Sequence, residues 1–271
     1  MDMQLKGKRA FVSGSNSGIG AEIARMLAAE GAAVVVHGRN EARARAVAAA
    51  ICAQGFEAHC VAGDLDTDAG ARDVVARARQ AVGDIDILIN NAGGRIEAAT
   101  SVAWFDQSPD LWNQTYNRNV TSAVRLIHLL TPGMRERQWG RLIQIGSLAG
   151  HSPPGRQPEY AAGKAAMINL TLGLSKELTG TGITANTVSP GMILTERLEG
   201  WIAQVGEQQG LGGDRERTID WILNNAVIQT VGRLGLPADI AFAVLYLSSP
   251  LADFVTGANI RVDGGTSQAV N

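Results

Sequence analysis

The sequence lacks a strong charge of either sign, and this excludes several classes of partner. Its 271 residues include 24 Lys and Arg and 26 Asp and Glu, which gives a formal net charge of −2. A nearly neutral chain whose basic residues are dispersed has no broad positive field to attract nucleic acid or an anionic membrane. We therefore expect neither nucleic acid nor a membrane as a partner.

Cysteines and long apolar runs are scarce as well. The two cysteines, Cys52 and Cys60, belong to no metal-ligand pattern, and none of the four histidines lies in a ligand cluster. The sequence therefore predicts no metal site, and it predicts reduced thiols that act as apolar filler. No apolar stretch approaches the ~20 residues that span a bilayer. Because the polar segment Met1–Arg9 also lacks a signal pattern, we expect a cytoplasmic protein.

What the sequence does contain is a regular alternation of short apolar runs with longer segments of helical spacing. The expected strands cover residues 9–12, 33–36, 57–62, 86–89, 141–145, 183–188 and 258–262. The expected helices cover residues 19–31, 40–53, 67–82, 109–137, 159–178 and 237–247. Strands that alternate with helices in this way predict a parallel sheet with helices on both faces. The predicted fold class is therefore α/β, with a doubly wound parallel sheet of about seven strands.

One segment departs from this rhythm. Residues 192–236 contain three closely spaced glycines, many charges and apolar residues that include Trp201 and Trp221. We interpret the segment as a helical substrate flap inserted into a single domain that covers residues 1–271, because no repeat or linker divides the chain. The tryptophans suit an apolar lid over a substrate, and core packing within the flap explains them equally well.

A glycine-rich turn follows the first expected strand. Residues 13–20 form the series Ser-Gly-Ser-Asn-Ser-Gly-Ile-Gly, and a helix comes directly after them. Glycine lets the backbone turn tightly and approach a diphosphate, and the start of a helix offers free N–H groups and a favourable dipole. A turn between a strand and a helix is the context that a dinucleotide site requires. The residues expected to bind the cofactor here are Gly14, Asn16, Ser17, Gly18, Ile19 and Gly20.

The glycine spacing, with three residues and then one residue between the glycines, resembles that of the short-chain dehydrogenase/reductase family. That family usually has Thr where Ser13 stands, and Ser keeps the hydroxyl. Further motifs agree with the family in order and spacing over residues 6–263, and the resemblance implies a Rossmann-like fold. It also implies an acid, Asp64, against the adenine ring, and an Asn-Asn-Ala-Gly signature along the cofactor channel. The further cofactor-binding residues that it implies are Asp64, Leu65, Asn91, Ala92, Gly93, Pro190, Gly191, Ile193 and Thr195.

The end of the second expected strand bears on the choice of cofactor. An NAD-selective site typically places an acid there to bind the adenosine ribose, and this chain has Gly38 instead. The planar guanidinium of Arg39 could bind a 2′-phosphate, with Asn40 beside it, although a surface Arg near a helix start is the alternative. Asn16 stands where NADP users of the family often carry a second basic residue. NADP(H) is favoured over NAD(H).

Tyr160 and Lys164 are the first candidates for catalysis. They are four residues apart in an expected helix and therefore share one face. Acid–base work near neutrality needs a phenol pKa below the ordinary value near 10, and a nearby ammonium group favours the phenolate. A Tyr-x-x-x-Lys pattern alone also arises by chance in many helices. Both residues are expected to contact the cofactor as well.

Ser147 strengthens this interpretation. It follows the fifth expected strand at the carboxyl edge of the sheet, where its hydroxyl can hydrogen-bond a substrate oxygen. It precedes Tyr160 by 13 residues, which is the separation found in the family. The resemblance also implies that Asn119 is a fourth catalytic residue, whose backbone carbonyl holds a water next to Lys164. His151 lies close to Ser147 and could contact substrate or be an ordinary loop residue.

The predicted function is an NADP(H)-dependent oxidoreductase that interconverts a small-molecule ketone and a secondary alcohol. A 3-oxoacyl-carrier-protein reductase and an NAD(H)-dependent sugar or alcohol dehydrogenase remain alternatives, and a non-catalytic nucleotide-sensing protein is a remote one. We expect the substrate pocket to include Gly94, Arg95, Leu148, Pro153 and the flap. The resemblance implies a homotetramer formed through the long helix and the helix of Tyr160 and Lys164.

Overall fold

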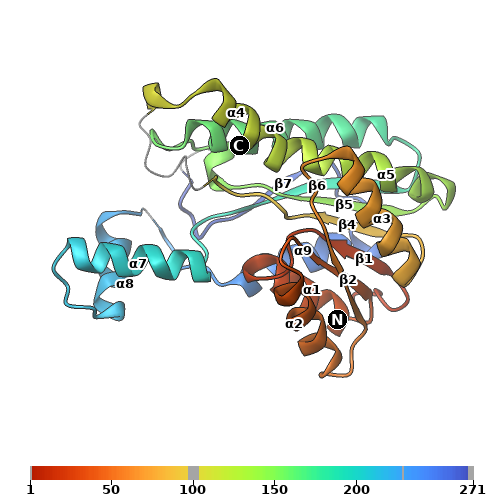
Figure 1. Ribbon diagram of the computed structural model, residues 1–271, viewed down its shortest axis with the longest axis horizontal. Helices are drawn as coiled ribbons and strands as arrows, with labels where there is room; N and C mark the ends of the chain where they lie inside the picture. The colour runs from red at the N-terminus through yellow and green to blue at the C-terminus, as the bar shows by residue number, and fades with distance from the viewer. Residues whose placement is uncertain (1, 97–103, 228, 268–271) are drawn as a thin grey trace.

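The described residues contain a central sheet of seven parallel strands (Figure 1). The computed structural model describes residues 2–96, 104–227 and 229–267. The strand order, β3-β2-β1-β4-β5-β6-β7, confirms the predicted doubly wound sheet. The strands are β1 Arg9–Val12, β2 Ala33–Gly38, β3 Ala58–Ala62, β4 Ile87–Asn90, β5 Gly140–Ile145, β6 Ile183–Pro190 and β7 Asn259–Val262.

The strand order reverses between β1 and β4, and this reversal positions the site. β1 pairs in parallel with β2 on one side and with β4 on the other. In a sheet of this kind a crevice forms at the carboxyl ends of the strands where the order reverses. The glycine-rich turn after β1 and the segment after β4 therefore meet at one edge of the sheet.

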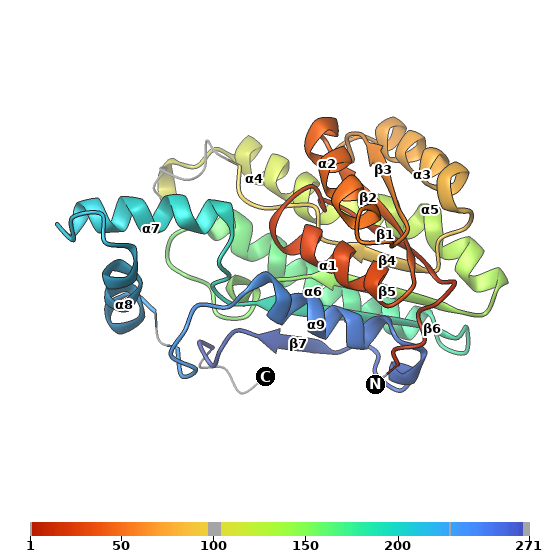
Figure 2. The same ribbon diagram turned by 90° about the horizontal axis from the view of Figure 1, so that it is seen from below.

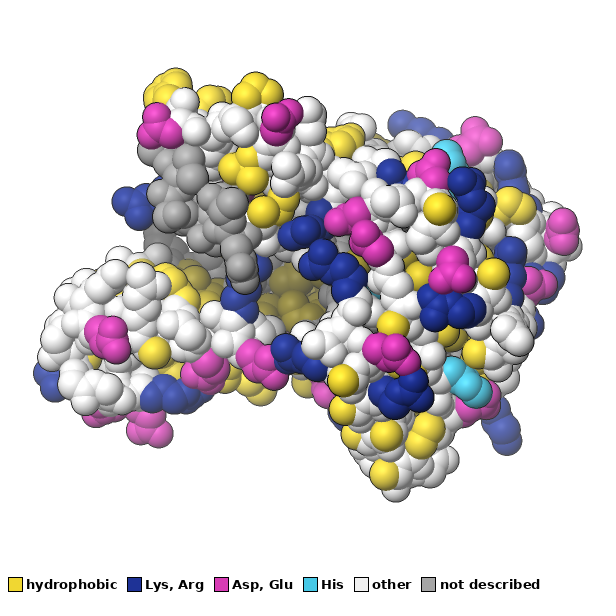
Figure 3. Space-filling model, viewed as in Figure 1, with side chains coloured by type: hydrophobic (Ala, Val, Ile, Leu, Met, Phe, Trp, Pro, Cys, Tyr) yellow, Lys and Arg dark blue, Asp and Glu magenta, His cyan; other side chains and the backbone are white. Residues whose placement is uncertain are grey.

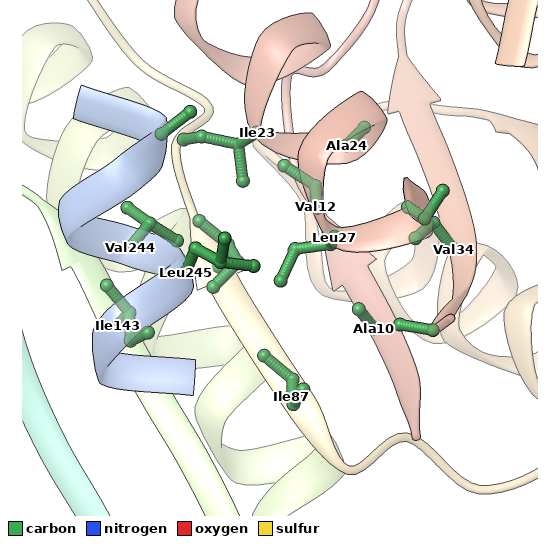
Figure 4. Packing of buried hydrophobic residues seen from close by; sticks show 14 of the residues in the cluster. Ala10, Val12, Ile23, Ala24, Leu27, Val34, Ile87, Ile143, Val244 and Leu245 are labelled. Carbon is green, nitrogen blue, oxygen red and sulfur yellow. The ribbon is translucent and has the colours of Figure 1, made fainter. Parts of the chain in front are cut away.

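Three helices cover one face of the sheet: α1 Gly18–Ala29, α2 Glu41–Cys52 and α9 Pro237–Ser248. In Figure 2, α1 and α9 lie in front of the sheet. Figure 4 shows how their apolar side chains meet those of the strands. Side chains alternate between the two faces along a strand, so the fully buried Ala10 and Val12 of β1 point to this layer. The labelled residues are Ala10, Val12, Ile23, Ala24, Leu27, Val34, Ile87, Ile143, Val244 and Leu245.

The opposite face is covered by α3 Asp68–Val82, α5 Ser122–Glu136 and α6 Pro158–Glu177. Phe11, between Ala10 and Val12 in β1, points to this side and joins a second core with residues of α3 and α5. The sheet is therefore buried on both faces, which is why its strands are continuous apolar runs in the sequence. Short 3-10 turns lie at η2 Trp104–Asp106, η4 Leu148–Gly150 and η5 Pro250–Ala252.

The helix expected over residues 109–137 is interrupted. It begins as α4 Pro109–Tyr116, changes to a π-helical turn η3 over Asn117–Thr121, and continues as α5. A π turn is a local feature that hydrophobic periodicity does not reveal, and such turns are frequent at functional sites. Asn119 lies within it and is buried. The predicted helical stretch is therefore confirmed over residues 109–136, and the π turn within it was not predicted.

The flap segment forms two helices, α7 Glu196–Gln208 and α8 Arg215–Asn225, which project to one side of the sheet (Figures 1 and 2). Its own small apolar cluster includes the buried Ile202 and Ile222. The two ends of the segment are joined at a bridge between Ile193 and Gly235, where the Leu194 N–H donates to the Gly235 carbonyl at 2.7 Å. The flap is therefore closed at its base and packed internally.

Two smaller expectations have different outcomes. Asn40 caps α2, as predicted, because its side chain accepts a hydrogen bond from the Arg43 N–H at 3.0 Å. Cys52 is exposed at the end of α2 and Cys60 is half-buried, so the interpretation of Cys52 as apolar filler is wrong. No helix in the described ranges is long and apolar enough to cross a membrane.

Candidate active site

Ser13 joins the turn after β1 to the end of β4. Its hydroxyl donates to the Ile89 carbonyl at 3.2 Å and accepts from the N–H groups of Asn91 and Ala92 at 3.0 and 2.9 Å. The Asn91 side-chain amide in turn donates to the carbonyls of Ser13 and Gly14, both at 2.9 Å. The two segments that carry expected cofactor residues are thus held together by a buried hydroxyl. Thr could make the same bonds.

His37, near the end of β2, also holds the glycine-rich turn that follows β1. The Gly14 N–H donates to its Nδ1 at 3.2 Å, and its Nε2 lies 3.3 Å from the Gly63 carbonyl. Nδ1 is therefore the unprotonated nitrogen and Nε2–H the donor. Burial lowers the pKa of His37 to about 4, so the ring is neutral near pH 7.

A cleft of about 720 Å³ opens at the reversal point of the sheet. Its floor consists of backbone: a Cβ on Gly14 would lie 2.8 Å from Ala92 Cα, and one on Gly20 would lie 2.6 Å from the Gly14 carbonyl oxygen. Side chains cap the N-termini of α2 and α3, but none caps α1, whose first N–H groups face the cleft. Free N–H groups at a helix start, beside a floor without side chains, fit the diphosphate of a dinucleotide.

Most of the predicted cofactor residues line this cleft. They are Gly14, Asn16, Ser17, Gly18, Ile19, Gly20, Arg39, Asn40, Asp64, Leu65, Asn91, Ala92, Gly93 and Thr195. Tyr160, Lys164, Pro190, Gly191 and Ile193 are not among its lining residues. Gly191 and Ile193 instead line a second cavity of about 560 Å³ between α1, α9 and β7. Thr195 caps α7, where its hydroxyl accepts from the Leu198 N–H at 3.4 Å.

Sequence reasoning missed several charged residues of the cleft. Arg43, Arg118, Glu196 and Arg197 line it together with the expected residues. Arg43, in the first turn of α2, forms an ion pair with Glu196, at the start of α7, with 2.5 Å between Nη2 and Oε2. Arg43 could have been predicted from the expected helix cap at Asn40, because this cap places the first turn of α2 beside the cleft. Thr195, a predicted cofactor residue and the cap of α7, was the corresponding signal for Glu196 and Arg197, which follow it in the chain.

Tyr160, Ser147 and Lys164 come together at the carboxyl edge of β5. Tyr160 and Lys164 lie in the first turns of α6, and Ser147 precedes η4. The Lys164 Nζ donates to the Ile145 carbonyl at 2.7 Å and lies 5.7 Å from the centre of the Tyr160 ring. Burial lowers the pKa of Lys164 to about 8.

Burial also raises the pKa of the Tyr160 phenol above its ordinary value, because it disfavours the charged phenolate. A hydrogen bond with Ser147 acts in the opposite direction, and so do the positive charges of Arg197 and Arg95. The groups around Tyr160 that favour the phenolate in this structure include Ser147, Arg197 and Arg95.

Asn119 fixes the segment that follows β4. Its Oδ1 accepts from the Gly94 N–H at 2.8 Å, and its Nδ2 donates to the carbonyls of Gly94 and Thr115 at 3.0 and 2.9 Å. A Cβ on Gly93 would lie 2.6 Å from Asn119 Oδ1, so this contact needs glycine. The polar atoms of the Asn119 side chain are thus hydrogen-bonded to the backbone of Gly94 and Thr115, and its Cβ lies beside Gly163 of α6.

Comparison with known proteins agrees with this arrangement. The family model described as short chain dehydrogenase matches residues 8–206. The chain belongs to the short-chain dehydrogenase/reductase family. Members of this family are NAD(P)-dependent oxidoreductases, and the cleft described above fits such a cofactor.

Individual members of the family match over the whole chain. The uncharacterized oxidoreductase YvaG of Bacillus subtilis is 35% identical, and the match covers 100% of both proteins. The 3-oxoacyl-[acyl-carrier-protein] reductase FabG of Vibrio harveyi is 32% identical, over 97% of this chain and 98% of FabG. The structure of L-sorbose reductase from Gluconobacter frateurii, complexed with NADPH and L-sorbose, has 31% identity and a TM-score of 0.92 over 100% of both chains. This short-chain dehydrogenase/reductase therefore resembles enzymes of different substrate classes to a similar degree.

Proposed function

We propose that the protein interconverts a ketone and a secondary alcohol, that it prefers NADP(H), and that residues 1–271 act as one catalytic domain with residues 192–236 as its substrate flap. The observation that carries this proposal is the placement of Ser147, Tyr160 and the buried Lys164 together at the carboxyl edge of β5, where the Lys164 Nζ is held by the Ile145 carbonyl. A phenol and a hydroxyl beside a bound nicotinamide form a site for a carbonyl oxygen.

The roles of the side chains follow from their surroundings. A bound nicotinamide supplies a hydride to the carbonyl carbon, or accepts one from the alcohol. Ser147 and Tyr160 hydrogen-bond the substrate oxygen and stabilise the charge that develops on it. Tyr160 donates its proton to this oxygen in reduction and accepts it in oxidation. Lys164, held by the Ile145 carbonyl, keeps an ammonium group near the phenol below pH about 8.

The preference for NADP(H) is supported by the residues after β2. A Cβ on Gly38 would lie 2.6 Å from Asn16 Cγ, so no carboxylate can extend from this position without moving Asn16. Arg39 and Arg43 line the same end of the cleft. Guanidinium groups bind phosphate through planar, paired hydrogen bonds. The L-sorbose reductase structure, which contains NADPH, is consistent with this preference.

Tyr160→Phe tests the proposed chemistry. Removing the general acid should lower kcat by ~10²- to 10⁴-fold with little change in NADPH affinity. The measurement is nicotinamide absorbance with a panel of ketones and alcohols, alongside a fluorescence titration of NADPH. Tyr246→Phe, in an exposed tyrosine of α9, serves as the matched control and should leave kcat unchanged. A Tyr160→Phe enzyme that keeps the wild-type kcat on its best substrate contradicts the proposal.

Arg39→Ala tests the cofactor preference. Wild-type protein should bind NADPH more tightly than NADH, and the variant should close this gap by weakening NADPH alone, by about tenfold. Arg45→Ala is the control, because Arg45 lies on α2 outside the cleft and pairs with Glu41. Equal affinities of the wild-type protein for NADPH and NADH would exclude the preference.

A second candidate is the reduction of a 3-oxoacyl group on a carrier protein, which similarity to FabG favours. A 3-oxoacyl thioester added to the same ketone panel distinguishes the two candidates. The ratio of its kcat/KM to that of the best free ketone shows which kind of substrate the enzyme prefers.

The homotetramer and the cytoplasmic location stay predictions. An apolar groove of about 540 Å³ between α5 and α6, lined by residues such as Ile127 and Leu174, supports association through these helices. Size-exclusion chromatography with light scattering tests the tetramer, and cell fractionation tests the location.

A further inference from the structure

Arg197 occupies a position that the stability of the flap does not explain. It lies in the first turn of α7, where a positive charge opposes the helix dipole. Within the described part of the chain it makes no ion pair or hydrogen bond with its guanidinium. The guanidinium instead lines the cleft, and a Cβ on Gly94 would lie 3.4 Å from its Nη1. An exposed arginine of the flap therefore points back to the catalytic side of the protein.

Arg95 brings a second guanidinium to the same place. It follows Gly94, whose N–H and carbonyl are both hydrogen-bonded by Asn119, so the backbone that carries it is fixed. The charges of Arg95 and Arg197 both lower the pKa of Tyr160, and the charge of Arg197 also lowers the pKa of Arg95. Two like charges within reach of each other and of the catalytic phenol are a costly arrangement unless an anion joins them.

Glu159 compensates part of this charge. It precedes Tyr160 in α6, is 2% exposed, and its charge acts on Arg95. Neither of its carboxylate oxygens has a hydrogen-bond partner among the described residues. Figure 3 shows a hollow between the flap and the body of the protein, with Lys and Arg side chains along part of its margin. Glu159 thus attracts Arg95 from within the protein, and Arg197 has no acidic partner among the residues that the structure describes.

We propose that Arg197, assisted by Arg95, binds a carboxylate of the substrate, so that the substrate is an oxo acid or the corresponding hydroxy acid. The inference rests on the proposed function, because it needs the substrate carbonyl at Ser147 and Tyr160. A planar guanidinium binds a carboxylate through two parallel hydrogen bonds, which also fixes the distance between the carboxylate and the reacting carbon. The carboxylate is unchanged in the reaction: the carbonyl gains a hydride at carbon and the Tyr160 proton at oxygen.

The cofactor is the other possible source of an anion in this cleft. The uncapped N-terminus of α1 would bind its diphosphate, and Arg39 and Arg43 would bind its 2′-phosphate. Arg95 does not line the cofactor cleft, whereas its charge reaches the catalytic phenol. Arg197 lines this cleft and also approaches Gly94, so the pair of arginines lies where the cofactor cleft meets the site of Tyr160. A bound carboxylate there also offsets their effect on Tyr160 and keeps the phenol protonated for reduction.

The test compares 2-oxo, 3-oxo, 4-oxo and 5-oxo acids with their methyl esters, which differ in charge and little in shape. Wild-type enzyme should prefer the best acid to its ester by at least ~10-fold in kcat/KM. Arg197→Gln should lower kcat/KM for that acid by ~10- to 100-fold, mainly through KM, and change the ester by less than ~3-fold. Arg197→Lys should recover part of the loss, because it restores the charge without the paired hydrogen bonds.

Arg217→Gln is the matched control, because Arg217 is an exposed arginine in the first turn of the other flap helix and forms no ion pair in the described structure. It should behave as wild type. Calorimetric titration of the acids and esters into the enzyme with NADP⁺ gives a second measurement that does not depend on turnover.

Two results would overturn the inference. One is a wild-type enzyme that reduces or binds esters as well as acids. The other is an Arg197→Gln variant that loses NADPH affinity and affects acid and ester equally, which would assign the arginine to the cofactor. The proposed function fails differently: no carbonyl compound is reduced, or Tyr160→Phe retains its activity.

Discussion

The nucleotide edge of the sheet and the flap are built in different ways. At the nucleotide edge, the turn after β1 is held by buried hydrogen bonds from Ser13, His37 and Asn91, and it is continuous with the main core. The flap has a separate apolar cluster around Ile202 and Ile222 and is joined to the sheet through a bridge at its base. One region is part of the core, and the other is attached to it.

This difference separates two tasks. Binding a diphosphate requires backbone groups at fixed positions, which a buried hydrogen-bond network provides. Selecting a substrate requires side chains that can differ without disturbing the sheet, and an attached helical pair provides these. We therefore expect substitutions at the nucleotide edge to change global stability, and substitutions in the flap to change substrate affinity.

The most direct test of this comparison is to make the same substitution in the main core, with which the nucleotide edge is continuous, and in the flap. Ile87 in β4 and Ile222 in α8 are both 0% exposed. Ile87→Ala should lower the free energy of unfolding by about 2–5 kcal/mol, because it leaves a cavity in the main core. Ile222→Ala should lower it much less and should instead expose the flap to protease and raise the substrate KM. Urea unfolding and limited proteolysis measure the two effects, and equal losses of global stability would show that flap and sheet unfold as one unit.

His37 should make the nucleotide edge sensitive to acid. Its folded-state pKa of about 4 lies below the unfolded value of 6.5, so the unfolded chain takes up the proton first as the pH falls. The contribution of neutral His37 to the free energy of unfolding is therefore complete above pH 6.5. It should fall by about 3 kcal/mol as the pH is lowered to 4. His37→Gln should be less stable than wild type at pH 7 and should lose less stability between these pH values. Parallel pH profiles of unfolding for the two proteins would contradict this role.

Ser13→Ala should affect the same edge more weakly. It leaves the Ala92 N–H without its buried acceptor and the Asn91 N–H with the Ile89 carbonyl alone, which costs about 1–3 kcal/mol. NADPH affinity should fall together with stability, because the turn and the segment after β4 lose their connection. Ser13→Thr keeps the hydroxyl and serves as the control in thermal unfolding and NADPH titration. An alanine variant with wild-type affinity would show that the backbone alone holds the turn.

The smallest expected effect lies where the two regions meet, at the ion pair of Arg43 and Glu196. Glu196 has a side chain that is 78% exposed, so the pair should contribute less than about 1 kcal/mol to stability. Glu196→Gln releases Arg43 for a 2′-phosphate and should tighten NADPH binding by ~3-fold at low salt without affecting NADH. Fluorescence titration of both nucleotides at two salt concentrations measures this. The same gain for NADH would exclude a role of the 2′-phosphate.

Much of the fold could be predicted because buried parallel strands are continuous apolar runs. The limits of β1, at residues 9–12, agree with the structure, and Asn40 caps α2 as its residue type suggests. The π turn around Asn119 could not be predicted, because one additional residue in a helix turn leaves the apolar pattern on either side intact. Cys52 was misjudged because residue type alone does not tell which face of α2 meets the sheet.

The residues of the candidate site could also be predicted only in part. Residues of the glycine-rich turn line the cleft because a short, local motif determines where they lie. The hydrogen bond from Gly14 to His37 and the approach of Arg197 to Gly94 join segments far apart in the chain. Such contacts depend on the packing of whole elements, and no local spacing encodes them. Pro190 and Gly191 lie outside the cofactor cleft for the same reason.

The π turn at Asn117–Thr121 also limits how the chain can change in length. Successive residues of an α-helix are rotated by about 100°, so a turn with one extra residue shifts the phase of everything that follows it. Deleting one residue here would restore a regular helix, and the buried face of α4 or that of α5 would then point to solvent. An exchange of one amino acid for another in this segment keeps the phase of the helix. A deletion or an insertion changes it, and Asn119 would then lose its place beside Gly94.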